Sequence, residues 1–139
     1  MSNKLIIANW KMNPESKEKA KVIVSEIESK IKKLKSVRIV ICPPFVFLNE
    51  VAKAISSSKK LYLGAQDLFI GEGESHTGEI SPKMLKNIGA QYIIVGHSEK
   101  RAICDTDEIV REKLFGALEN GFKAILCVGE KERDNHGKF

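Results

Sequence analysis

Chemically versatile side chains directly follow several short apolar runs in this 139-residue chain. They are Asn9, Lys11, Gln66, Asp67, His97, Glu99 and Glu130. Singly, each has an ordinary structural use, since a lysine is usually solvated, a histidine satisfied by hydrogen bonds and a glutamate ion-paired. If the runs are parallel strands, however, their carboxyl ends meet at one rim, where α/β proteins bind ligands. The pattern therefore favours a binding or acid–base site assembled from distant parts of the chain.

The apolar runs recur with a regular spacing. They are expected to form strands at Lys4–Ala8, Val37–Cys42, Leu61–Gln66, Gln91–Gly96 and Lys123–Val128. The spacing is roughly 30 residues, the size of a βα module, and uninterrupted apolar strands are typical of a parallel sheet covered on both faces. The pattern predicts an α/β fold of five strands and four helices. It is equally compatible with a doubly wound sheet and with part of a barrel.

Capping signals predict where the helices begin. They are Asn13-Pro14, Ser81-Pro82 and the capping-box pattern Asp105-x-x-Glu108, with a further helix over Phe45–Ile55. The last helix is expected to bury Ile109, Leu114 and Leu118, and Gly89 is expected to end the third. These helices would connect successive strands and so bring the polar strand ends together.

Composition narrows the class of protein. Hydrophobic residues make up 42% and charged residues 29%, no apolar run has the roughly 18 residues of a membrane span, and no signal peptide is evident. Three widely spaced cysteines without a C-x-x-C pair indicate reduced thiols. The +5 charge is spread along the chain, so nucleic-acid binding has only net charge in its favour. We expect one cytoplasmic domain over residues 1–139 with no cofactor, metal, membrane or nucleic-acid partner.

Six segments together resemble the triosephosphate isomerase family in that family's order and spacing. They are A-N-W-K-M-N at 8–13, C-P-P-F at 42–45, G-A-Q-D at 64–67, T-G-E-I-S at 77–81, V-G-H-S-E-K-R at 95–101 and C-V-G-E at 127–130. The resemblance implies the N-terminal half of a (β/α)8 barrel, about (βα)4 plus a fifth parallel strand. It also implies interconversion of glyceraldehyde 3-phosphate and dihydroxyacetone phosphate in glycolysis and gluconeogenesis.

The same resemblance implies roles for the polar residues at the strand ends. Asn9 and Lys11 would bind the phosphorylated triose, and a compact ammonium suits that substrate. His97 would polarise the carbonyl as a neutral imidazole. The family is itself a standard example of a histidine whose pKa is lowered by a helix N-terminus. Glu99 would contact Lys11 and assist proton transfer.

The resemblance further implies an interface between two copies of the chain. Gln66, Asp67, Thr77 and Gly78 would lie in this interface, and Glu130 would be structural. A half barrel would also expose two strand edges and an apolar inner face, which predicts a homo-oligomer.

The family's carboxylate base, its lid and its phosphate loops follow the fifth strand, and the 139 residues hold none of them. We therefore expect little turnover by these residues alone, because a general base contributes about 10²–10⁴-fold. One alternative is a non-catalytic half barrel that self-associates or complements a missing half. Another phosphate-binding α/β enzyme is a weaker alternative, since the glycines at 71–74 alternate with glutamates that repel phosphate.

Overall fold

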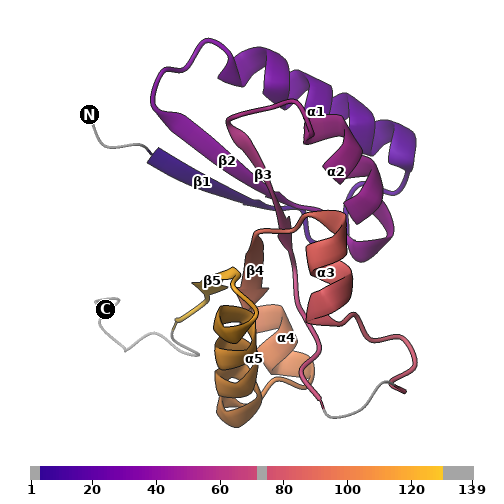
Figure 1. Cartoon of the computed structure of the whole chain (residues 1–139), viewed down its shortest axis with the longest axis vertical. Helices are drawn as coiled ribbons and strands as arrows, with labels where there is room; N and C mark the ends of the chain where they lie inside the picture. Colours follow the sequence, from indigo (N-terminus) through magenta and orange to yellow (C-terminus); the bar gives the residue numbers. More distant parts are fainter. Residues whose placement is uncertain (1–3, 72–74, 130–139) are drawn as a thin grey trace, which may run out of the picture.

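A computed structural model of the chain describes residues 4–71 and 75–129, in which parallel strands alternate with helices (Figure 1). The strands are β1 (Lys4–Asn9), β2 (Val37–Cys42), β3 (Leu61–Ala65), β4 (Tyr92–Val95) and β5 (Lys123–Leu126). The helices are α1 (Lys17–Ile31), the 3₁₀ turn η1 (Phe45–Phe47), α2 (Leu48–Ile55), α3 (Pro82–Ile88), α4 (Ser98–Ile103) and α5 (Asp107–Glu119). The predicted α/β fold is confirmed, with strand limits within two residues of those expected.

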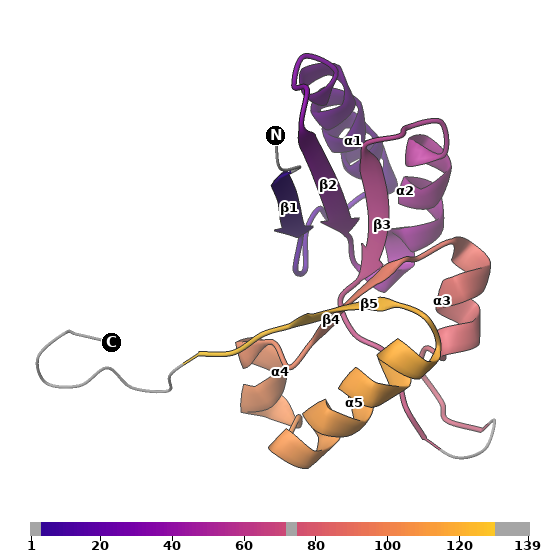
Figure 2. The same cartoon turned by 60° about the vertical axis from the view of Figure 1, so that its left-hand side comes forward.

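The sheet has the strand order β1-β2-β3-β4-β5, and every neighbouring pair is parallel. A doubly wound sheet would reverse its order at a switch point, and this sheet does not. Instead it curls, with β4 and β5 turned away from the plane of β1 and β2 (Figure 2). The expected partial barrel of five parallel strands is therefore confirmed, and β1 and β5 are its edges.

Apolar side chains fill both faces of the sheet. On the outer face, Ile41, Leu63 and Ile93 pack with residues of the covering helices. On the inner face, Val40 and Ile94 belong to a second cluster of buried residues. Because neighbouring residues of a strand point to opposite faces, both sides need apolar residues, which explains the uninterrupted runs.

The first helix begins later than the sequence predicted. The Asn13-Pro14 signal is wrong: Ser16 is the N-cap, and its hydroxyl accepts a 3.2 Å hydrogen bond from the Lys19 N–H. The chain before it forms a turn, in which the Asn13 N–H donates to the Trp10 carbonyl at 3.1 Å. The helix cannot start until this turn has ended.

The last helix also differs from the expected capping box. Thr106 is the N-cap of α5, and its hydroxyl accepts from the Ile109 N–H at 3.3 Å. Asp105 is 4% exposed and turns inward instead, because a buried lysine on α5 supplies its partner. Leu118 is 50% exposed, not buried, because the inward face of α5 carries Val110, Lys113, Gly116 and Ala117.

The other predicted helix limits agree with the structure more closely. Ser81 caps α3, and Gly89 ends it with a left-handed φ of 90°, as predicted. The helix expected from Phe45 starts with the η1 turn and becomes α-helical at Leu48. In the part of the chain that the structure describes, no helix has the length and apolar character needed to cross a membrane.

Candidate active site

His97 lies between the end of β4 and the first residue of α4. It is the N-cap of α4, and its Nδ1 accepts a 3.2 Å hydrogen bond from the Glu99 N–H. A nitrogen that accepts carries no proton, so the neutral ring has its proton on Nε2. The fold therefore orients the ring and selects one tautomer, which leaves Nε2–H as a donor.

Lys11 reaches the same rim from the loop that follows β1. Its backbone is left-handed, with φ of 54°, a conformation that few residues with a Cβ adopt. The Lys11 N–H donates to Oδ1 of Asn9 at 2.9 Å. The side chain of Gln66 donates from Nε2 to the Lys11 carbonyl at 2.8 Å and to the Cys42 carbonyl at 3.0 Å.

Glu99 joins Lys11 to His97. Its Oε1 accepts from the Lys11 ammonium at 2.6 Å across 88 residues of sequence. Its Oε2 lies 3.6 Å from Nδ1 of His97. The hydrogen bond and charge of Lys11 outweigh desolvation and lower the pKa of Glu99, so the carboxylate stays ionised at neutral pH. The structure thus brings together the three residues expected to act on the substrate.

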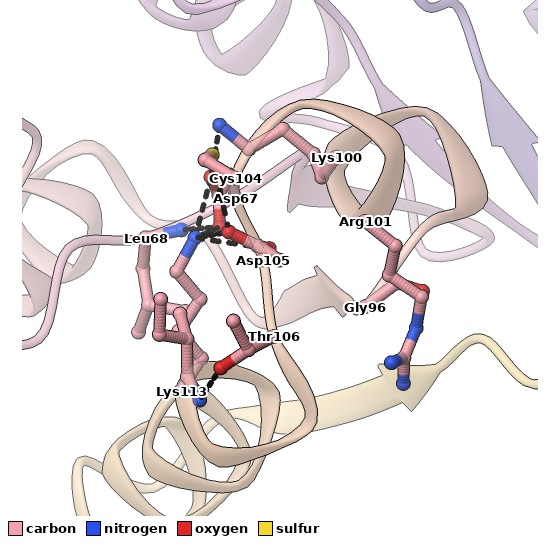
Figure 3. Close-up of polar contacts among 10 residues, drawn as sticks. Asp67, Leu68, Gly96, Lys100, Arg101, Cys104, Asp105, Thr106 and Lys113 are labelled. Atoms are coloured by element: carbon pink, nitrogen blue, oxygen red, sulfur yellow. Dashed lines mark hydrogen bonds and ion pairs between the residues drawn. The ribbon is translucent and has the colours of Figure 1, made fainter.

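Figure 3 shows a second charged cluster, which the sequence did not predict and which includes Lys100, the residue after Glu99. The Lys113 ammonium is bound by Asp67 at 2.8 and 2.9 Å and by Asp105 at 3.0 and 3.2 Å. Lys100 also binds Asp67, at 3.0 Å. We call Asp67, Lys100, Asp105 and Lys113 the buried charge cluster. Lys113 stands between Val110 and Gly116 on the inward face of α5, and a lysine at such a position needs anionic partners.

The residues expected at an interface separate into two groups. Thr77 and Gly78 lie in an exposed turn, and Gly78 has φ of 87° with no atom within 4 Å of where its Cβ would be. Gln66 and Asp67 instead make the contacts within the chain described above. A hollow of about 190 Å³ nevertheless has both Asp67 and Gly78 in its lining.

Two further expectations concern metals and Glu130. Within residues 4–71 and 75–129, no group of three or more histidine, cysteine, aspartate or glutamate side chains is arranged to hold a metal ion. Glu130, expected to be structural, lies outside the described residues.

Fold and site together define a class: a curled parallel α/β half barrel with an imidazole, an ammonium and a carboxylate at its carboxyl rim. Comparison with known proteins identifies the family. The triosephosphate isomerase family profile matches residues 4–138. Triosephosphate isomerase of Thermoanaerobacter sp. (strain X514) is 46% identical over 131 residues, which cover 94% of this chain and 52% of the relative. That of Alkaliphilus oremlandii is 42% identical over 142 residues, 100% of this chain and 56% of the relative.

The chain belongs to the triosephosphate isomerase family. It spans about half the length of the curated relatives it matches.

Proposed function

We propose that this chain supplies the electrophilic part of a site that interconverts glyceraldehyde 3-phosphate and dihydroxyacetone phosphate, in glycolysis and gluconeogenesis. The observation that carries the proposal is the hydrogen bond from the Glu99 N–H to Nδ1 of His97, beside the contact between Lys11 and Glu99. The family relationship supports the substrate class.

His97 would act through Nε2. An Nε2–H donor aimed at the substrate oxygen stabilises the negative charge that develops when a proton leaves the neighbouring carbon. A neutral imidazole can then give its Nε2 proton to that oxygen and take a proton from the other, which returns the ring to its starting state. Because Nδ1 is occupied by a backbone donor, the ring is held for this task.

Lys11 and Asn9 would bind the substrate. The ammonium of Lys11 supplies positive charge for the phosphate and the reacting oxygens, and 52% of its side chain is exposed at the rim. Glu99 holds that ammonium in place without burying it. Asn9 fixes the loop through its Oδ1, which accepts from the Lys11 backbone.

The carboxylate base, the water-excluding lid and the phosphate loops have to come from residues outside these 139, in the same polypeptide or in another. We therefore propose that the 139 residues alone turn over triose phosphates poorly. A homo-oligomer is proposed for a separate reason, the exposure of the sheet edges. β1 and β5 are the edges of the sheet, and the apolar Leu5, Ile6 and Leu126 are between 44% and 48% exposed. Gln66, Asp67, Thr77 and Gly78 are proposed to lie at a separate contact between copies, around the hollow that Asp67 and Gly78 line.

The catalytic proposal is tested by complementation. The purified chain is assayed in a coupled isomerase assay alone, and again after mixing with the C-terminal half of the Thermoanaerobacter relative. Turnover is expected only in the mixture, and His97→Ala should lower it by about 10²–10⁴-fold. Robust turnover by the chain alone would contradict the proposal that the base, lid and phosphate loops come from other residues. A mixture in which His97→Ala is as active as the unaltered chain would overturn the role of His97.

The assembly proposal needs a separate measurement. Light scattering of the 139-residue chain at micromolar concentration is expected to give a mass above that of one copy. A clean monomer would overturn self-association and leave the open edges to be covered by a different partner.

A further inference from the structure

Gly116 lies in the interior of α5, a position where a glycine is unfavourable. Glycine loses more conformational freedom on folding than alanine does, and Gly116 is buried next to Ala117 on the inward face of the helix. A Cβ at this position would lie 2.3 Å from Cδ1 and 2.7 Å from Cγ1 of Ile70, closer than real Cβ atoms approach a neighbour. The glycine therefore leaves room for the side chain of Ile70.

Ile70 belongs to the chain between β3 and α3, which α5 holds at two points (Figure 1). Asp67 binds Lys113 at 2.8 Å, and Ile70 packs on Gly116. Lys113 and Gly116 are three residues apart, so they lie on the same face of the helix. One point is an ion pair and the other is apolar, since Ile70 is partly buried against the main core. Two contacts of different kinds thus fix the direction in which this chain leaves β3.

Further contacts link Ile70 to the exposed turn of Thr77 and Gly78. The N–H of Phe69, the residue before Ile70, donates to the Ile80 carbonyl at 3.0 Å. The Phe69 ring also lies against the ring of His76, with 4.4 Å between the centroids. His76 and Ile80 are on either side of the turn. A displacement of Ile70 would therefore move the residues that flank the turn.

We propose that Gly116 is a positioning residue for the contact between copies of the chain: by leaving room for Ile70, it holds the exposed turn of Thr77 and Gly78 in the orientation that a second copy meets. This role rests on the assembly proposed above for the identity of the partner. The packing of Ile70 on Gly116 exists within one chain, so it can be measured separately from assembly.

A double-mutant cycle tests whether Ile70 is the reason for the glycine. Gly116→Ala is expected to lower the urea midpoint of the chain, because the added methyl group would overlap Ile70. In a chain that already carries Ile70→Ala, the same substitution is expected to raise the midpoint, because the higher helix propensity of alanine then acts alone. A midpoint that changes in the same direction in both backgrounds would overturn the proposal.

The cycle also decides the matter if Gly116→Ala fails to fold. Folding of the double variant Ile70→Ala/Gly116→Ala would then be a rescue, and it would support the proposal. A double variant that fails to fold, although Ile70→Ala alone folds, would overturn it.

Amide hydrogen exchange measures whether the chain between β3 and α3 is displaced. The Phe69 N–H is expected to exchange at least tenfold faster in Gly116→Ala. The Gln91 N–H, which bonds to β3 at 2.9 Å, reports on the sheet and is expected to change less. Glu112→Ala alters an exposed position of the same helix and is the matched control, in which neither rate should change. Equal acceleration of the two amides in Gly116→Ala would indicate a general loss of stability and would contradict a positioning role.

Light scattering over a range of protein concentrations connects the packing to assembly. Gly116→Ala is expected to raise the dissociation constant of the assembly at least tenfold relative to Glu112→Ala. An unaltered dissociation constant, with Phe69 exchange accelerated, would overturn the role of Gly116 in the contact. A monomeric unaltered chain would contradict the proposed assembly and this role together, whereas the urea and exchange measurements would still decide whether Gly116 holds the chain between β3 and α3.

Discussion

Two sets of ion pairs lie side by side on the rim of this half barrel, and they differ in their exposure to solvent. In the pair formed by Lys11 and Glu99, 52% and 57% of the side chains are exposed. In the buried charge cluster, the side chains of Lys113, Asp67 and Asp105 are 11%, 15% and 2% exposed, and Lys100, at the margin of the cluster, is 40% exposed. The first pair has one short contact, whereas Lys113 has four carboxylate contacts.

The difference in exposure suits the two sets of ion pairs to different tasks. An exposed pair can exchange its partner for a charged substrate at little cost, because water already solvates both groups. A buried ammonium has lost its water, so it needs the carboxylates to remain where they are. The open pair is therefore suited to ligand binding, and the closed cluster to fixing the loop after β3, α4 and α5 relative to one another.

The largest expected effect follows from removing the buried ammonium. Lys113→Met would leave two carboxylates with little exposure and without their main partner, which is expected to lower the free energy of unfolding by about 3–5 kcal/mol. Urea denaturation followed by circular dichroism measures this loss. The matched variant is Lys11→Met, which removes the same group from an exposed pair and is expected to leave the midpoint unchanged. Equal losses in the two variants would contradict the distinction between them.

A smaller effect is expected from neutralising one carboxylate of the cluster. Asp105→Asn retains the shape of the side chain, and Lys113 would still bind Asp67, so the expected loss is about 1–3 kcal/mol. Glu99→Gln is the equivalent change at the exposed pair and should leave the urea midpoint nearly unaltered. A Glu99→Gln variant less stable than Asp105→Asn would show that the open pair, not the cluster, holds the rim.

The smallest expected effect is the pH dependence of the exposed pair. The pKa of Glu99 is lowered in the folded chain, so any stability from the pair is present above the ordinary pKa of 4.5 and is lost as the pH falls through the lowered value. Urea midpoints of the unaltered chain and Glu99→Gln should differ slightly at pH 7 and converge at low pH. A difference that grows on acidification would reverse the sign and refute the lowered pKa.

The sequence predicted the strands and the positions of His97 and Lys11 because the signals for them are local. An uninterrupted apolar run and the polar residue that ends it can be recognised within ten residues, and parallel pairing then brings the ends together. The caps at Ser81 and Gly89 were predicted for the same reason. Asn13 and Asp105 failed as caps because Ser16 and Thr106, a few residues later, made the hydrogen bonds expected of them.

Only the folded chain decided which charges are buried together. Lys113 is one of 23 basic residues and has no local mark of its role, since its partners lie 8 and 46 residues away in the sequence. The Lys11 carbonyl likewise accepts a hydrogen bond from Gln66, 55 residues distant. Sequence therefore determined the elements and the residues at their ends, because hydrophobic periodicity and capping act over short distances. Tertiary structure decided the partners, because the desolvation that makes an ion pair or an amide contact consequential exists only after distant segments have packed.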